Sequence, residues 1–219
     1  MRTLNAWHVS PREAAAIQER LAPLVVQVGG PDEVRHVAGV DVAFAGGRTV
    51  AAVAVLRYPE LDVAEVARAE LPTDFPYVPG LLSFREAPAI LDAWAKLRTE
   101  PDLIVVDGHG VAHPRRLGIA AHLGLWLDKP TIGSAKSPLV GRPGFLADDV
   151  GATADIVDRD EVVGLAVRTK AGAKPIYVSV GHHIALESAA RWTLCLCRGY
   201  RLPEPQRQAH LAASARSAR

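Results

Sequence analysis

Two acidic side chains stand where a carboxylate needs a partner or a ligand. Asp41 is the only acid within the β-rich segment 35–44, and valines flank it on both sides. Asp107 directly follows the apolar segment 103–106, which is typical of a central strand buried on both faces. A carboxylate at such a position costs free energy unless a charge or a ligand compensates for it. Both residues are candidates for binding a cation, although Asp107 has the alternative role of capping a helix.

Glu86 is a third acidic candidate with two possible roles. The segment Ser83-Phe84-Arg85-Glu86 matches a capping box, which predicts that a helix opens at Ser83. In that role the Glu86 carboxylate binds the backbone N–H of Ser83. The same first-turn position also places the carboxylate at the positive end of the helix, beside the preceding loop. The local pattern does not rank these two roles.

The segment 72–82, PTDFPYVPGLL, is predicted to be a stiff irregular loop. Three prolines and a glycine interrupt it, so neither a helix nor a strand can continue through it. It carries two aromatic residues, Phe75 and Tyr77, and Tyr77 lies next to Pro76. Either these rings pack into the core, or the loop is an apolar wedge of the kind that proteins insert into a base stack.

The elements that must position these residues follow from periodicity and turn signals. We expect an antiparallel meander of three strands, a central strand and a second short strand, with helices between them. The expected helices span residues 11–24, 83–97, 114–128, 185–197 and 203–215, and the expected strands span residues 35–44, 50–57, 61–71, 103–106, 131–134, 162–169 and 176–180. Residues 140–159 are rich in glycine and aspartate, and we expect them to form an irregular insertion. This order predicts an α/β protein with a ribonuclease H-like fold, in which a mixed central sheet (antiparallel three-strand meander plus parallel strands) is flanked by helices.

The overall charge gives no signal for nucleic acid, because the chain of 219 residues has a net charge of +1. A local signal begins at Arg198, where one acid, Glu204, accompanies five arginines, namely Arg198, Arg201, Arg207, Arg216 and Arg219. Such a basic tail would suit a phosphate backbone, and an ordinary solvated tail is the alternative. The apolar runs are too short to span a bilayer, so we expect a cytoplasmic protein with no membrane partner.

Five motifs together resemble the endonuclease V family. They are VAGVDVAF at 37–44, FPYVPGLLSFREAP at 75–88, DGHGVAHPRRLGIAAHLG at 107–124, TIGSAKS at 131–137 and PEPQRQAH at 203–210. The resemblance covers nearly the whole chain with the motifs in the family's order, and it implies one endonuclease V-like domain over residues 1–219. It also implies a repair endonuclease for deaminated purines, chiefly deoxyinosine. Such an enzyme cuts the second phosphodiester bond 3′ to the lesion and leaves 3′-hydroxyl and 5′-phosphate ends.

The resemblance assigns roles to the acidic residues and their neighbours. Asp41, Glu86 and Asp107 match the metal-binding carboxylates of the family, Lys136 its active-site lysine and His210 a histidine near the metal. The implied cofactor is Mg²⁺, for which Mn²⁺ substitutes, since hard oxygen ligands suit both ions. Two such ions about 3.5–4 Å apart would hold the attacking water and the leaving oxygen.

The resemblance also assigns the recognition of the lesion. Pro76, Tyr77, Val78 and Pro79 match the wedge that takes the place of the displaced base, with Val78 where the family often has isoleucine. Gly80, Leu82, Gly110 and His113 fall in the stretches that line the lesion pocket. Inosine pairs weakly, so pulling it from the stack costs less than for a normal base. The implied partner is single- or double-stranded DNA containing deoxyinosine, bound by a monomer.

Three alternatives stay open at the level of the sequence. The first is an endoribonuclease of the same fold, specific for inosine in RNA. The second is a module that binds distorted DNA without cutting it. The third is a zinc hydrolase built on His109, His113, His182 and His183, although Pro114 interrupts the H-x-x-x-H spacing and no H-E-x-x-H is present.

Overall fold

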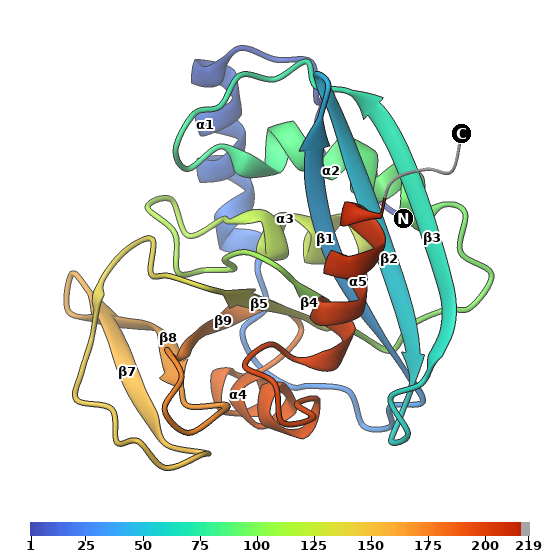
Figure 1. Ribbon diagram of the computed structural model, residues 1–219. Coiled ribbons are helices and arrows are strands. Elements are labelled where there is room, and N and C mark those ends of the chain that lie inside the picture. The colour runs from blue at the N-terminus through green and yellow to red at the C-terminus, as the bar shows by residue number, and fades with distance from the viewer. Residues whose placement is uncertain (216–219) are drawn as a thin grey trace.

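A mixed sheet of nine strands runs through the protein in the order β3-β2-β1-β4-β5-β9-β8-β7-β6. The computed structural model describes residues 1–215 (Figure 1). The strands are β1 (His36–Ala45), β2 (Arg48–Arg57), β3 (Val63–Pro72), β4 (Leu103–Val106), β5 (Thr131–Ala135), β6 (Arg142–Pro143), β7 (Thr153–Asp158), β8 (Glu161–Val167) and β9 (Ile176–His182). The β1–β2 and β2–β3 pairs are antiparallel, while β4 is parallel to both β1 and β5. The predicted fold class, a mixed sheet with an antiparallel meander, is confirmed.

The helices cover both faces of this sheet. They are α1 (Pro11–Leu21), followed by the 3₁₀ turn η1 (Ala22–Leu24), then α2 (Leu82–Trp94), α3 (Ile119–Leu127), α4 (Leu186–Cys195) and α5 (Glu204–Ser214). Figure 1 shows α5 lying across one face of β1 and β2, with α2 behind these strands. None of the helices within residues 1–215 has the length and apolar character needed to cross a membrane.

Residues of β4 alternate between the two cores, as a doubly covered strand requires. Leu103 and Val105 pack in the core that includes residues of α4 and α5. Ile104 and Val106 pack in the core under α2 and α3. Asp107 comes next in this alternation, so the β4 register directs it towards the α5 face of the sheet.

The turn between β1 and β2 sets the start of the meander. Ala45 pairs with Arg48 across a two-residue connection. Gly46 and Gly47 both have positive φ, at 55° and 74°, as a tight type I′ hairpin turn requires. Glycine adopts this backbone conformation without steric cost, so the A-G-G-R sequence fixes the register of β1 on β2.

Three of the expected elements differ from the structure. The capping box at Ser83 is wrong: α2 begins at Leu82 with no side-chain cap, and Ser83 lies inside the helix, where its Oγ bonds Nδ1 of the buried His122 at 3.1 Å. The helix expected from Pro114 begins only at Ile119, because residues 114 and 115 form a turn closed by the bond from the Arg116 N–H to the His113 carbonyl. Residues 140–159 are not wholly irregular, since they include β6 and β7, which extend the edge of the sheet.

Close packing of α5 on β1 depends on Gly39. A Cβ at this position would lie 1.8 Å from the carbonyl oxygen of Pro205, in the first turn of α5. No real contact is so short, so any side chain at position 39 has to push the helix away from the strand. The glycine therefore lets the C-terminal helix lie directly on β1.

We predict that Gly39→Ala lowers the free energy of unfolding by about 1–3 kcal/mol, the usual cost of overpacking a core. Gly144→Ala is the matched control, because its Cβ would meet nothing closer than 3.9 Å and its φ is not in the left-handed region. Urea unfolding of both variants checks the prediction. Equal stability of the two variants would show that α5 does not rest on Gly39.

Candidate active site

Asp41 and Asp107 lie side by side because β1 and β4 run parallel. Val40 is the register partner of Val106, and the Asp107 N–H donates to the Val40 carbonyl at 3.0 Å. Each acid thus follows its paired valine, Asp41 in the middle of β1 and Asp107 at the carboxyl end of β4. The carboxyl ends of parallel strands are where open α/β sheets bind ligands. Glu86 joins them from α2, where it is buried. Asp41, Glu86 and Asp107 are called the acidic cluster below.

The three carboxyl groups repel one another in a poorly solvated place. Burial raises the pKa of Glu86 to about 8, and the charges of Asp41 and Asp107 add to this effect. The pKa of Asp107 is also raised, first by burial and then by Asp41, while Lys136 opposes the shift. Glu86 is therefore largely protonated at neutral pH when no cation is bound.

Two basic side chains contact the acidic cluster. The Lys136 Nζ donates to Oδ2 of Asp107 from the loop that follows β5. Nδ1 of His210, in α5, hydrogen-bonds Oδ2 of Asp41 at 2.7 Å. An ionised carboxylate only accepts hydrogen bonds, so the proton of a neutral His210 lies on Nδ1 and Nε2 keeps its lone pair. All five residues expected to act in catalysis, from five separate parts of the chain, therefore come together.

The donor set of the acidic cluster fits a hard divalent cation. Carboxylate oxygens are the ligands that Mg²⁺ and Mn²⁺ prefer in proteins. The raised pKa of Glu86 is a second sign of a cation site. Burial favours a proton on this group, and a cation would take the place of that proton. The chemistry of Asp41, Glu86 and Asp107 thus fits a metal ion, although without one their oxygens do not all lie within 4.8 Å of one another.

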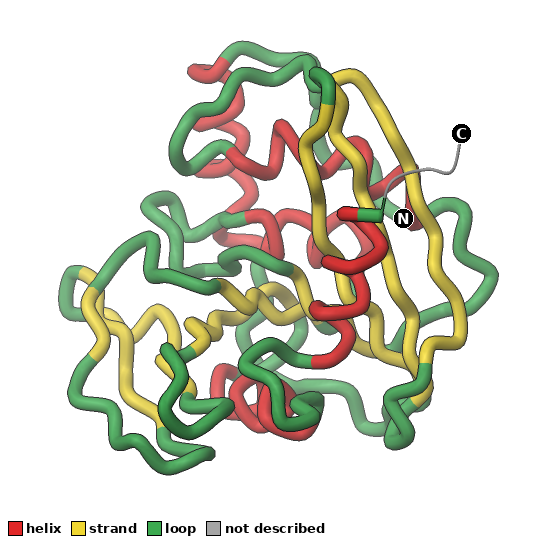
Figure 2. The backbone as a smooth tube through the Cα atoms, viewed as in Figure 1, coloured by secondary structure: helices red, strands yellow, loops and turns green. Residues whose placement is uncertain are grey.

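The predicted wedge lies on the loop of residues 73–81, called the proline loop below, which appears in Figure 2 as the loop between β3 and α2. Tyr77 is 73% exposed at its tip, whereas Phe75 is buried against Phe84. Of the two aromatic residues, Phe75 therefore packs into the core, whereas Tyr77 is exposed as a wedge would be. The exposed tip is available to a ligand.

A cavity of about 150 Å³ lies against the C-terminal half of the proline loop. Its walls include three expected pocket residues, Gly80, Leu82 and His113, and three wedge residues, Tyr77, Val78 and Pro79. Gly110 lies elsewhere, packed on β9, where a Cβ would come within 1.8 Å of the Val180 carbonyl oxygen. A substitution of Gly110 would therefore disturb the sheet itself, whatever it did to the cavity.

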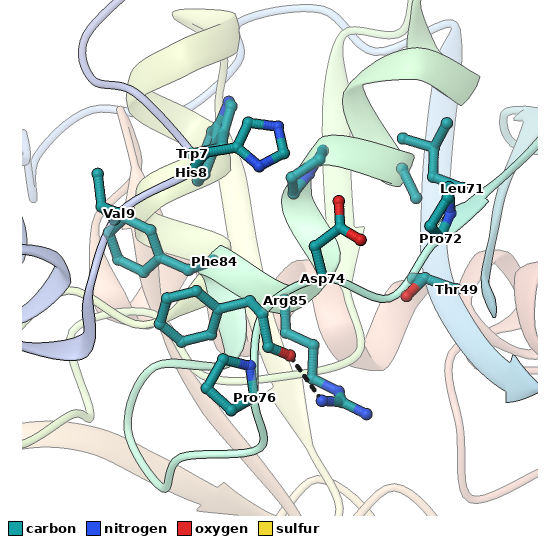
Figure 3. A pocket seen from close by; sticks show the side chains of 13 residues that line it. Trp7, His8, Val9, Thr49, Leu71, Pro72, Asp74, Pro76, Phe84 and Arg85 are labelled. Atoms are coloured by element: carbon teal, nitrogen blue, oxygen red, sulfur yellow. Dashed lines mark hydrogen bonds between the residues drawn. The ribbon is translucent and has the colours of Figure 1, made fainter. Parts of the chain in front are cut away.

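A second cavity, of about 290 Å³, borders the N-terminal half of the loop. Figure 3 shows the Asp74 carboxylate in this cavity below His8, with Trp7 and Phe84 to one side. The Arg85 guanidinium forms part of its wall and donates to the Phe75 carbonyl at 2.7 Å. This bond fixes the start of the proline loop on α2.

Two buried glutamines were not singled out from the sequence. Gln206 of α5 bonds both the hydroxyl and the carbonyl of Ser134, and like Lys136 it opposes the rise in the pKa of Asp107. Gln18 of α1 binds the carbonyls of Gly80 and Leu117. A signal for Gln18 was present, since it falls on the apolar stripe between Ala14 and Leu21, where a polar residue needs partners.

The four histidines considered for zinc do not come together. Within residues 1–215, the one set of three potential ligands whose atoms all lie within 4.8 Å of one another is Asp128, His182 and His183. The Val26 N–H donates to Nδ1 of His182, so the proton of the neutral ring lies on Nε2. That nitrogen is the one that faces Asp128, and it has no lone pair to give to a metal.

The basic tail is only partly free to bind phosphate. Arg201 donates to the carbonyls of Lys136, Lys174 and Pro175. Arg207 forms an ion pair with Glu204 and stacks over Tyr200. These two side chains hold the chain that leads into α5, and Arg216 and Arg219 lie outside the described residues.

Fold and site together define a nuclease of ribonuclease H-like fold, in which acids on two neighbouring parallel strands and on an adjacent helix gather in one place. The model of the family described as Endonuclease V matches residues 19–211. The endonuclease V of Gloeobacter violaceus is 54% identical over 212 residues, which cover 94% of this chain and 86% of the relative. The chain belongs to the endonuclease V family.

Solved structures agree with this assignment. The crystal structure of the Streptomyces avermitilis endonuclease V has a TM-score of 0.90 and 42% identity, covering 95% of this chain and 93% of that one. The Ciona intestinalis endonuclease V has a TM-score of 0.81 and 28% identity, covering 92% and 95% of the two chains. It was crystallised in complex with a 24mer DNA containing an inosine followed by a ribo-adenosine.

The raised pKa of Glu86 makes stability depend on pH and on divalent cations. Between pH 4.5, the ordinary pKa, and about pH 8, the folded protein binds a proton at Glu86 that the unfolded chain does not. In EDTA this contribution to stability is therefore full below pH 4.5 and is lost as the pH rises through 8. We predict that Glu86→Gln removes this fall and makes the protein more stable than the wild type at pH 8.

Mg²⁺ should stabilise the wild type more at pH 8 than at pH 5, because the cation replaces the Glu86 proton. The stabilisation should be smaller in Glu86→Gln, and Glu187→Gln, an exposed glutamate of α4, is the control. Urea unfolding at both pH values, with EDTA or Mg²⁺, makes the comparison. An equal effect of Mg²⁺ on all three proteins would argue against cation binding at Glu86.

Proposed function

We propose that this protein hydrolyses one strand of DNA at a deaminated purine, chiefly deoxyinosine. The proposed cut falls at the second phosphodiester bond 3′ to the lesion and leaves 3′-hydroxyl and 5′-phosphate ends. The observation that carries the proposal is the acidic cluster, with Lys136 and His210 bound to it, beside an exposed apolar loop and a cavity. Membership of the family supports the reaction, and the inosine-containing DNA of the Ciona complex supports the substrate.

The proposed cofactor is Mg²⁺, with Mn²⁺ as a substitute, held by Asp41, Glu86 and Asp107. When bound, it supplies positive charge that stabilises the negative charge developing on the phosphate oxygens. Burial and the two aspartates raise the pKa of Glu86, and the charge of a bound cation would favour its ionised form.

The basic residues have separate roles in the proposed reaction. Lys136 is held by Asp107 and adds a fixed positive charge for the phosphate. His210 is oriented by Asp41 through Nδ1, which leaves Nε2 to accept or return a proton during water attack. Since the His210 side chain is half exposed, its proton can exchange with solvent.

The proline loop is the proposed wedge. Pro76 and Pro79 restrict the backbone on either side of Tyr77 and Val78, so an apolar tip meets the base stack with little loss of conformational entropy. The displaced base would enter the cavity lined by Gly80, Leu82 and His113. Weak pairing of inosine lowers the cost of this displacement and favours the lesion over normal bases.

An inosine-specific endoribonuclease is the second candidate. The observation in its favour is the ribo-adenosine after the inosine in the Ciona complex, which places a ribose next to the lesion. A module that binds without cutting is less well supported, since binding alone gives no reason to gather three repelling carboxyl groups. The cytoplasmic location and the monomeric state stay predictions from the sequence.

We predict a single nick one nucleotide beyond the inosine in a labelled duplex, dependent on Mg²⁺ and absent on the undamaged duplex. Duplexes with a deoxyribose or a ribose 3′ to the inosine, and a matched inosine RNA, should run in parallel. Cutting of the RNA alone would move the activity to the second candidate. Tight binding to the lesion without cutting of any substrate would contradict both.

Asp107→Asn should lower the cutting rate by about 10³-fold or more. It removes a carboxylate that would hold the cation, and with it several kcal/mol of transition-state stabilisation at the phosphate. Binding to the inosine duplex in EDTA should change only a few-fold. Asp155→Asn, on an exposed position of β7, is the matched control and should cut like the wild type. Full activity of Asp107→Asn would exclude the acidic cluster as the catalytic site.

A further inference from the structure

The carbonyl oxygen of Gly80, at the end of the proline loop, accepts three hydrogen bonds. The donors are Nε2 of His113 at 2.8 Å, Nε2 of Gln18 at 3.0 Å and an Nη of Arg115 at 3.0 Å. A carbonyl oxygen has two lone pairs, so three donors on one oxygen exceed the usual number. Gln18 and His113 are both buried. Such a concentration of buried donors holds this carbonyl in one position.

His113 cannot also bind a base through its ring nitrogens. Its Nδ1 accepts the backbone N–H of Arg115 at 3.1 Å, which leaves the proton of the neutral ring on Nε2. That proton is donated to the Gly80 carbonyl. The lowered pKa of His113, about 4 because of burial, agrees with a neutral ring. His113 lines the cavity, but both of its polar atoms are used within the protein.

Gln18 is held in a single orientation by its own bonds. Its Nε2 donates to the carbonyls of Gly80 and Leu117, at 3.0 and 2.9 Å, and its Oε1 accepts from Nε of Arg115 at 2.6 Å. Turning the amide over would set two carbonyl oxygens against Oε1 and the guanidinium against the NH₂ group. One side chain of α1 thus joins the proline loop to the turn that precedes α3.

The contacts at Gly80 and at Phe75 fix both ends of the proline loop. The Leu81 N–H donates to the Val78 carbonyl, with Pro79 and Gly80 between them and φ of Gly80 at +79°, as in a type II turn. At the other end, Arg85 holds the Phe75 carbonyl. The exposed tip at Tyr77 lies between these two fixed points.

We propose that Gln18 is a positioning residue for the wedge, acting through the Gly80 carbonyl together with Arg115 and His113. This inference rests on the proposed function, since it assigns to Gln18 the task of presenting Tyr77 and Val78 to the base stack. His113 serves the same task and does not read the base. Loss of Gln18 frees the end of the loop and leaves the acidic cluster unchanged.

The test compares Gln18→Met and Gln18→Glu with Leu21→Val. Methionine keeps the length of the side chain without its hydrogen bonds, and glutamate sets a second acceptor against the two carbonyls. Leu21→Val is the matched control, because it weakens a buried contact of α1 with α3 that does not involve the loop. In the free proteins, hydrogen exchange of residues 73–81 should accelerate about tenfold or more in both Gln18 variants and not in the control.

The functional readout is cutting of inosine in a duplex and in a single strand. A duplex needs the wedge to open its stack, while a single strand largely does not. The Gln18 variants should lose about tenfold or more in kcat/KM on the duplex and less than about threefold on the single strand. A 2-aminopurine next to the inosine should lose its increase in fluorescence on binding to the variants in EDTA.

Equal losses on duplex and single strand would overturn the assignment of Gln18 to the wedge. Unchanged hydrogen exchange of residues 73–81 would show that the bond from Gln18 to the Gly80 carbonyl does not hold the loop. A wild type that cuts no inosine substrate would contradict the proposed function instead. In that case, faster exchange in the Gln18 variants would still show that Gln18 holds the proline loop in the wild type. The two proposals therefore fail on different measurements.

Discussion

Repulsion among Asp41, Glu86 and Asp107 is the constraint on which the rest of the site depends. The parallel pairing of β1 and β4 forces the two aspartates together, and α2 adds a buried glutamate whose pKa rises to about 8. Removing carboxylates from water is costly, and Lys136 and His210 compensate for only part of that cost. The cluster therefore favours the binding of a positive charge, such as a divalent cation.

The C-terminal helix completes this arrangement by close packing. His210 reaches Asp41 only because α5 lies directly on β1, and Gly39 is the residue that allows the approach. The same helix places Gln206 beside Ser134 and Asp107. Arg201 and Arg207, which resemble phosphate ligands in sequence, instead hold the chain that leads into this helix.

Recognition and chemistry are supported by different contacts. The acidic cluster rests on the sheet, while the proline loop is held at its two ends by Arg85 on α2 and by the donors around the Gly80 carbonyl. α2 joins the two regions, since Arg85 and Glu86 are consecutive residues that face the loop and the cluster respectively. In the proposed reaction, a rigid loop set beside the acids would let displacement of a base and cutting of the strand occur in one bound state.

The amino-acid sequence by itself determined the meander and the central strand, because alternation and turn chemistry act over short distances. It also marked Asp41 and Asp107 as carboxylates in need of a partner, whereas the roles of Glu86, Lys136 and His210 were inferred from the family motifs. Local signals failed where distant groups competed for the same atoms. The Ser83 hydroxyl bonds His122 rather than a helix N-terminus, and Glu86 turns to the aspartates. Gln18 found its partners in two loops about 60 and 100 residues away, a pairing that no periodicity encodes. Only the tertiary structure decides such contacts, since buried polar atoms take whichever partners packing brings within hydrogen-bonding distance.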